Sequence, residues 1–103
     1  MLLALKDVWG NSVNLAKERM THLLEHPEIR GQEAKIGETL LEPEVVIQSQ
    51  TDYTVRLFHR FYRRLRIGDK YLCVVVKYTR DDVFIITAYF TDKVKRGEVL
   101  WEK

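Results

Sequence analysis

The spacing of apolar residues changes once along this chain, near Glu44, and this change limits the possible folds more than any other feature. Before Glu44, apolar residues recur at helical spacing, and Pro27 and Pro43 each close a helical segment. After Glu44, the period is two, which is typical of strands. This order predicts an α+β domain in which helices pack on one face of an antiparallel sheet.

The N-terminal part predicts two helices. The first follows Asn11 and Ser12, either of which can cap it, and continues to Pro27. Its apolar positions are Val13, Ala16, Met20, Leu23 and Leu24. The second helix is expected over residues 32–41, although Gly37 in its interior weakens it.

Four strands are predicted after the second helix, over residues 45–47, 55–64, 71–78 and 83–91. Short turns at residues 67–70 and 80–82 make the last three strands a meander of hairpins. Weaker strand patterns at residues 2–4 and 99–101 could extend the sheet. The expected fold is therefore two N-terminal helices packed on a four-stranded antiparallel sheet, with residues 1–103 as a single domain.

The composition is that of a folded globular domain, with 46% hydrophobic and 31% charged residues in 103. No apolar run approaches the length of a membrane span. The apolar start meets Lys6 and Asp7, which does not fit a signal peptide, so we expect a cytoplasmic protein without membrane partners. The single Cys73 cannot form an internal disulfide, and we expect a buried thiol rather than a nucleophile.

Positive charge is concentrated in the middle of the chain. Residues 44–80 hold eight Lys/Arg against three Asp/Glu, a net charge of +5, while the whole chain carries only +2. Screening limits each charge to about 8–10 Å, so this local excess matters more than the total. It indicates a basic surface suited to an anionic partner.

Five arginines lie between Arg56 and Arg66. In a strand, alternate residues share a face, and one face here interleaves guanidinium groups with aromatic rings. That face carries Arg56, Phe58, Arg60, Tyr62 and Arg64. Such a surface can bind phosphates and stack bases. The other face, with Val55, Leu57, His59 and Phe61, is mostly apolar and could sit on the core. The alternative is an edge strand whose charges discourage aggregation.

Several short motifs occur in an order that resembles the phage-associated branch of the barnase–EndoU–colicin–RelE superfamily of nucleases. The motifs are HLLEHPE at 22–28, IGETL at 36–40, Pro43, LF at 57–58, YLCVVVK at 71–77, FIITAY at 84–89 and KRGEVLW at 95–101. The likeness covers residues 19–101. It implies two N-terminal helices on a four-stranded antiparallel sheet, and RNA cleavage without metal or cofactor on the exposed sheet face. Members are often toxins or domains of phage and mobile-element proteins.

The resemblance also implies a set of catalytic positions. It places the helix histidine at His22, the strand basic positions at Arg56 or Arg60 and at Lys77, and the late-strand polar positions at Thr87 and Tyr89. RNA cleavage by the 2′-hydroxyl needs a base, an acid and cations that stabilise the phosphorane. We expect RNA binding by Phe58, Tyr62, Arg63, Arg64 and Arg66.

Each of these residue types also has a structural interpretation. His22 could be an ordinary residue of the helix surface, and the arginines could be simple surface charge. Lys77 could extend from a strand end into solvent, and Thr87 and Tyr89 are at home in any strand. Glu25, Glu28 and Glu38 are alternative general bases, or solvated helix residues.

The other two histidines are interpreted differently. His22 and His26 have the spacing of metal ligands on a helix, but no third ligand lies nearby, so no metal site is predicted. His59 falls on the apolar side of its strand, where we expect a core histidine.

The sequence therefore predicts a metal-independent endoribonuclease that cleaves RNA by attack of the 2′-hydroxyl. One alternative is a non-catalytic nucleic-acid-binding module, and another is a toxin-like domain covered by an acidic antitoxin or immunity protein. The ribonuclease requires Arg56, Arg60, Lys77, Thr87 and Tyr89 to share one open sheet face beside His22. A slip of one residue in strand register would reverse that arrangement.

Overall fold

The computed structural model describes residues 2–103. Two short helices lie between the second and third of seven strands. The elements are β1 (Leu2–Lys6), β2 (Ser12–Ala16), α1 (Lys17–Leu23), α2 (Ala34–Leu41), β3 (Val45–Gln48), β4 (Val55–Leu65), β5 (Gly68–Tyr78), β6 (Val83–Thr91) and β7 (Val99–Glu102).

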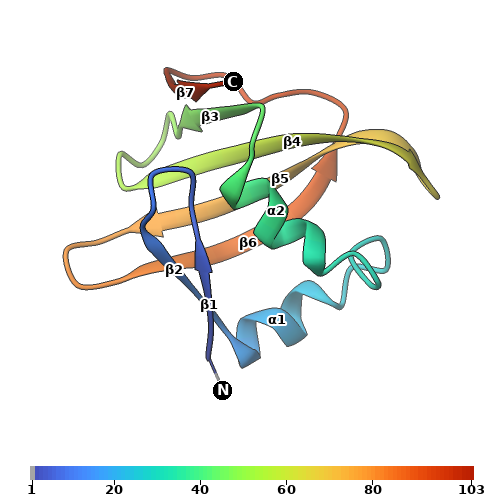
Figure 1. Ribbon diagram of the computed structural model, residues 1–103, viewed down its shortest axis with the longest axis horizontal. Coiled ribbons are helices and arrows are strands. Elements are labelled where there is room, and N and C mark those ends of the chain that lie inside the picture. The colour runs from blue at the N-terminus through green and yellow to red at the C-terminus, as the bar shows by residue number, and fades with distance from the viewer. Residues whose placement is uncertain (1) are drawn as a thin grey trace.

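All seven strands belong to one curled sheet in the order β1-β2-β6-β5-β4-β3-β7. Neighbouring strands are antiparallel except β2 and β6, which are parallel. In Figure 1, α1, α2 and the β1–β2 hairpin lie in front of the long strands. α1 contacts β6 and β2, while α2 contacts β5, β4 and β1, so one face of the sheet is covered.

The prediction of two helices on a four-stranded antiparallel sheet is wrong. Residues 13–16, where the sequence pattern predicts the start of the first helix, belong to β2 instead, and the weak strand pattern at residues 2–4 becomes its partner β1. In β2, Val13 and Leu15 are buried while Ser12 is exposed, which is the alternation of a half-buried strand. The helical spacing of Val13, Ala16 and Met20 is therefore coincidental.

Asp7 holds the turn between β1 and β2. Its buried carboxylate accepts hydrogen bonds from the backbone N–H groups of Trp9 and Asn11, at 3.0 and 2.8 Å, and from the Asn11 side chain at 3.0 Å. The Tyr78 hydroxyl donates to the same carboxylate at 2.7 Å. This side chain thus closes the hairpin and fixes it to β5.

The meander predicted after Glu44 is present, as β3 to β6 pair in sequence as antiparallel neighbours. The β4–β5 hairpin is longer than expected, because β5 already begins at Gly68. Figure 1 shows this hairpin extending beyond the other strands. The weak pattern at residues 99–101 forms β7, which pairs with β3 at the edge of the sheet.

The main core lies between the sheet and the helices. Its fully buried side chains come from both helices, the β1–β2 hairpin and the long strands, and include Leu23, Ile36, Phe58, Leu72 and Ile85. A smaller apolar cluster of Val55, Cys73 and Val75 lies on the opposite face. Cys73 is a buried free thiol, as predicted.

The connection between β6 and β7 covers part of this second face. The backbone N–H of Lys95 donates to Nε2 of His59 at 3.2 Å. Gly97 has φ +148°, and a side chain there would collide with the Gln48 carbonyl oxygen. Only glycine fits such a close approach without strain. His59 is consequently fully buried, which confirms it as a core histidine.

Candidate nucleic-acid interface

The predicted site residues do not share one sheet face. Phe58 belongs to the main core under the helices, so its alternate neighbours Arg56, Arg60 and Tyr62 point to the helix side. Directly paired residues of antiparallel strands share a face, and Lys77 pairs with Val55 of the second cluster. The expectation that arginine and lysine groups converge on one open face is therefore wrong.

This inversion arises because sequence alternation cannot show which face meets the helices. The face with Val55, Leu57 and His59 looked like the core face, but it carries the smaller cluster. The face with Phe58 packs against the helices, because Leu72, Val74 and Val76 of β5 continue the same apolar surface. The main core thus tolerates arginines at its edge.

Arg56 has a packing role at that edge. Its guanidinium lies 4.8 Å from the ring centre of Trp9 and 4.0 Å from that of Tyr78. A cation between two rings is attracted by both aromatic faces. Arg56 therefore fastens the β1–β2 hairpin to the long strands, rather than presenting a free guanidinium.

Arg60 and Tyr62 form hydrogen bonds with α2 and with the residue just after it. Arg60 donates to the carbonyl oxygen of Glu42, just after the helix. The Tyr62 hydroxyl donates to Glu38 at 2.8 Å, and burial raises the pKa of Tyr62 to about 12. These groups anchor the helix to β4.

Lys77, Thr87 and Tyr89 lie together on the second face, because Val75 pairs with Thr87 and Cys73 pairs with Tyr89. The Lys77 ammonium is 3.3 Å from the carboxylate of Asp52. Burial raises the pKa of Tyr89, and it raises that of Cys73 to about 11. At neutral pH this face therefore holds a tyrosine that can donate a hydrogen bond but cannot act as a base.

His22 lies on the exposed surface of α1. Its side chain is 57% exposed, and its Nδ1 atom is 3.5 Å from the Glu25 carboxylate. His22 occupies the helix side of the sheet, whereas Lys77, Thr87 and Tyr89 occupy the other side. One phosphate group cannot touch all four side chains.

The remaining predicted residues lie at the free end of the β4–β5 hairpin. Tyr62 pairs with Lys70 and Leu65 pairs with Gly68, so Arg63 and Arg64 oppose the single residue Asp69. This is a β-bulge, which re-aims side chains at the end of a strand pair. Both arginines are exposed, as is Arg66 in the turn.

Arg64 adopts an unusual backbone conformation within the bulge. Its φ is +61°, and its N–H donates to the Asp69 carboxylate at 2.9 Å. Glycine is the usual residue at such a position, and another L-residue costs about 1–2 kcal/mol. A cation held at this cost points to a role for the side chain beyond folding.

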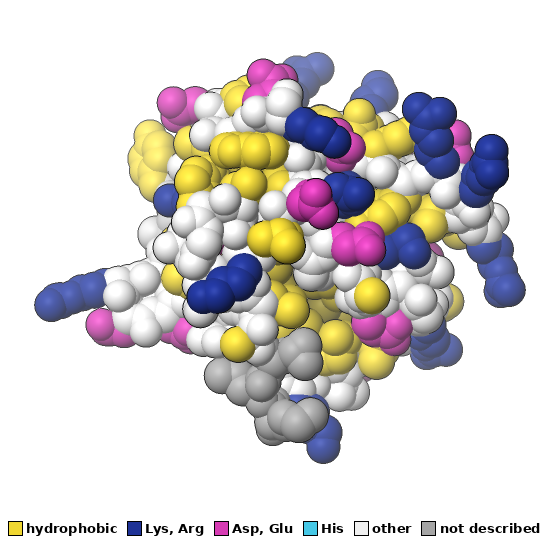
Figure 2. All heavy atoms as spheres, viewed as in Figure 1, with side chains coloured by type: hydrophobic (Ala, Val, Ile, Leu, Met, Phe, Trp, Pro, Cys, Tyr) yellow, Lys and Arg dark blue, Asp and Glu magenta, His cyan; other side chains and the backbone are white. Residues whose placement is uncertain are grey.

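The hairpin end is electropositive. Among the side chains that the structure describes, no carboxylate lies within ion-pair distance of Arg63, Arg64 or Arg66. Figure 2 shows Lys and Arg side chains gathered at the right-hand edge, where Figure 1 places this hairpin. The predicted basic surface is therefore an end of the molecule rather than a sheet face.

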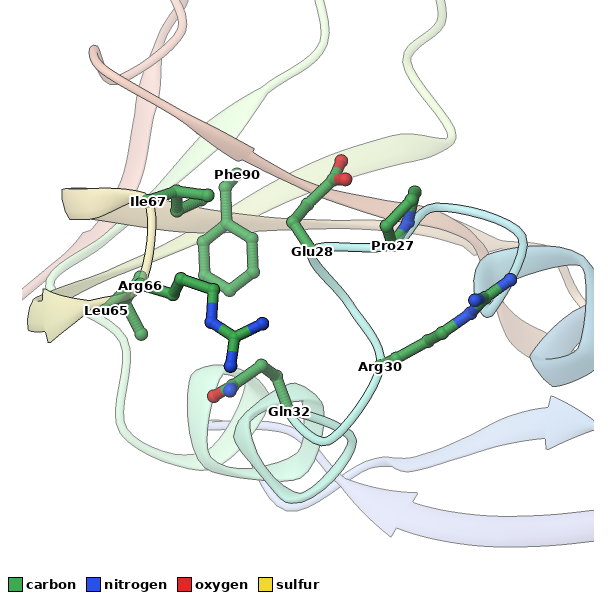
Figure 3. A pocket seen from close by; sticks show the side chains of 8 residues that line it. All are labelled: Pro27, Glu28, Arg30, Gln32, Leu65, Arg66, Ile67 and Phe90. Carbon is green, nitrogen blue, oxygen red and sulfur yellow. The ribbon is translucent and has the colours of Figure 1, made fainter.

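A pocket of about 220 Å³ lies beside the hairpin. One side is formed by residues of the α1–α2 connection, the other by residues 65–67, and Phe90 of β6 contributes an aromatic wall. The lining residues of the connection are Pro27, Glu28, Arg30 and Gln32. Figure 3 shows the Arg66 guanidinium directed toward Gln32 across this pocket, beside the Phe90 ring. Glu28 also lines it, 3.9 Å from His26.

Sequence reasoning missed Gln32 and Phe90. Phe90 fitted the apolar face of its strand, and Gln32 marked only a helix start. Neither residue carried a signal of binding, because the pocket forms between segments distant in sequence. The basic run 63–66 was the only local signal for this region.

Comparisons with family models, with curated proteins and with solved structures found no match to this chain. Within the described residues, no group of three or more His, Cys, Asp or Glu side chains is placed to hold a metal ion. None of the helices in residues 2–103 is long and apolar enough to cross a membrane.

Proposed function

We propose that this protein binds single-stranded RNA through the free end of its β4–β5 hairpin. The observation that carries the proposal is the bulge, which exposes Arg63 and Arg64 beside Arg66 and holds Arg64 at φ +61°. A guanidinium offers a planar fork of donors that matches a phosphate. Three such groups at one end form a compact anion-binding surface.

Aromatic groups next to the arginines favour single-stranded nucleic acid over other polyanions. The Arg63 guanidinium lies 5.8 Å from the Phe61 ring centre, and Phe90 lines the adjacent pocket. Proteins that bind single strands combine a positive surface with rings on which bases stack. RNA is favoured because its unpaired bases are the usual targets of such surfaces.

The division of the predicted catalytic residues favours binding over cleavage. Cleavage by the 2′-hydroxyl needs a base, an acid and cations around one phosphate. Arg56 and Arg60 are engaged on the helix side, while Lys77 is paired with Asp52 on the other. An RNA-binding module needs only the hairpin end.

Fluorescence anisotropy with a labelled eight-nucleotide RNA tests this proposal over a range of NaCl concentrations. Affinity should fall as salt rises, with a slope of about 0.7 per phosphate contacted. The double variant Arg63→Gln/Arg64→Gln should bind about tenfold more weakly and show a smaller slope. The matched control Arg19→Gln/Arg80→Gln removes the same charge from α1 and the β5–β6 turn, and should change binding far less.

The same RNA should stay intact during incubation with the protein in EDTA. Equal losses in both double variants would show that only total charge matters and would refute a specific hairpin surface. Cleavage that leaves 2′,3′-cyclic phosphate ends, and that is slower in His22→Ala, would refute the non-catalytic binding module and support the ribonuclease.

A further inference from the structure

The pocket beside the hairpin has the features of a base-binding site. Phe90 provides an aromatic wall. Its ring packs against the main core but stays partly exposed. Gln32 supplies an amide from the α1–α2 connection, and Figure 3 shows the Arg66 guanidinium reaching toward this amide beside the Phe90 ring. A mostly preformed cavity with one apolar surface and a few polar groups is the usual form of a small-ligand site.

Gln32 carries hydrogen-bonding capacity that the fold leaves unused. Its carbonyl oxygen Oε1 is buried, and no donor reaches it within the described residues. Buried polar atoms are nearly always satisfied, so an orphaned one calls for a partner. Because Oε1 is buried, a base reaches it only when the neighbouring side chains move aside; the amide then presents a donor and an acceptor side by side, which matches the edge of a nucleobase.

The charges in and around the pocket separate the base from the phosphate. Glu28 and Arg30 line the α1–α2 side of the pocket with opposite charges, and Figure 3 shows both charged groups directed away from the Phe90 ring, which leaves the space beside the ring suited to a neutral group. Arg66 lies in the wall toward the hairpin, and Arg63 and Arg64 lie beyond it. A nucleotide would therefore place its base in the pocket and its phosphates along the arginines.

From this arrangement we infer that the pocket takes the base of one unpaired RNA nucleotide. The ring stacks on Phe90, the Gln32 amide hydrogen-bonds the base edge, and Arg66 binds the neighbouring phosphate. The inference rests on the proposed RNA binding and deepens it, because the hairpin arginines alone would accept any polyanion. It requires that single-stranded RNA binds more tightly than a duplex, whose bases are already stacked and paired.

The decisive variants keep the net charge of the protein while removing the groups that would recognise a base. Phe90→Leu removes the ring, and Gln32→Leu replaces the amide by an apolar group of similar size. Each should weaken binding of the labelled eight-nucleotide RNA by about tenfold. Neither should change the salt slope or the weaker binding of the same RNA annealed to its complement. The controls Phe84→Leu and Gln50→Leu, a ring of the same strand and an amide in another loop, should stay within about twofold.

A measurement on the unaltered protein guards against a variant that folds poorly. In NMR titrations with the RNA, the signals of the Gln32 side-chain NH₂ and the Phe90 ring should shift together with those of the hairpin arginines. The four free mononucleotides should shift the same two signals only at much higher concentration, since they lack the flanking phosphates. Saturation by free nucleotides at the RNA's own concentration would overturn an RNA site in favour of a nucleotide site.

The outcomes distinguish this inference from the proposed function. If Phe90→Leu and Gln32→Leu bind RNA like the unaltered protein while the hairpin double variant does not, the base pocket is refuted and RNA binding stands. Equal affinity for single-stranded and duplex RNA also refutes the pocket. If no salt-dependent RNA binding occurs at all, the proposed function fails and the pocket assignment fails with it.

Discussion

Single residues in this protein show how one side-chain type serves several purposes. Arg56 packs between two rings, Arg60 binds the end of α2, and Arg64 is exposed in a bulge. All three lie within nine positions of one strand, and their sequence contexts are alike. Whether an arginine is available to a ligand is decided by the residues that surround it in the neighbouring strands and in the layer of helices.

Replacing Arg64 tests whether stability is given up for binding. Arg64→Gly should raise the free energy of unfolding by about 1 kcal/mol, because glycine adopts the positive φ without strain. The same variant should bind RNA more weakly, since a guanidinium is lost. Urea denaturation and anisotropy measure the two effects.

Arg63→Gly is the matched control for this substitution. Arg63 is not among the residues with positive φ, so glycine there should lower stability by about 0.5–1 kcal/mol. Its RNA affinity should also fall. If Arg64→Gly is the less stable of the two, the strain at Arg64 has been misjudged.

The buried His59 makes stability depend on pH. Burial lowers the pKa of His59 from 6.5 to about 4, so the unfolded chain binds a proton more readily than the folded one. The stability contribution is full above pH about 6.5 and is lost as the pH falls toward 4. The loss is at most about 3.5 kcal/mol, from about 1.4 kcal/mol per pKa unit.

Urea denaturation at several pH values checks this prediction. His59→Gln keeps an acceptor for the Lys95 N–H and cannot titrate, so its stability should be flatter between pH 6.5 and 4. Carboxylates such as Asp52 also titrate toward acid pH, and they remain in both proteins. Parallel profiles for the variant and the unaltered chain would rule out His59 as the source.

At the scale of elements, the β1–β2 hairpin and β7 extend the four-stranded meander at its two edges into a seven-stranded sheet. β2 pairs with β6 in parallel, through Asn14 opposite Phe84, and so joins the N-terminus to the centre of the fold. The two strands of this hairpin, β1 and β2, are only five residues long each. Besides the buried Val13 and Leu15, the Asp7 turn and Arg56, which lies near the rings of Trp9 and Tyr78, hold this hairpin to the long strands.

Asp7→Ala should detach this hairpin. The substitution leaves the part-buried N–H donors of the turn and the Tyr78 hydroxyl without an acceptor, so the free energy of unfolding should fall by about 2 kcal/mol. Asp81→Ala, at an exposed acid in the β5–β6 turn, should change it by less than about 0.5 kcal/mol. Urea denaturation compares them, and equal losses would mean that the Asp7 carboxylate does not hold the hairpin.

At the scale of the whole molecule, charge and chemistry are separated by the sheet. The helix side carries the main core and the engaged arginines, the second face carries Lys77, Thr87 and Tyr89, and the exposed Arg63, Arg64 and Arg66 lie at the end of the β4–β5 hairpin. A small net charge of +2 thus conceals an electropositive hairpin.

Local pattern alone determined the four strands after Glu44, the helix that ends before Pro43, the buried Cys73 and His59, and the basic run that includes Arg63 and Arg64. Each of these follows from side-chain spacing within one segment. The tertiary structure alone decided that residues 12–16 pair as a strand, which face of β4 meets the helices, and that Gln32, Arg66 and Phe90 line one pocket. These features depend on contacts between distant segments, and alternation with a period of two is the same whichever face is covered.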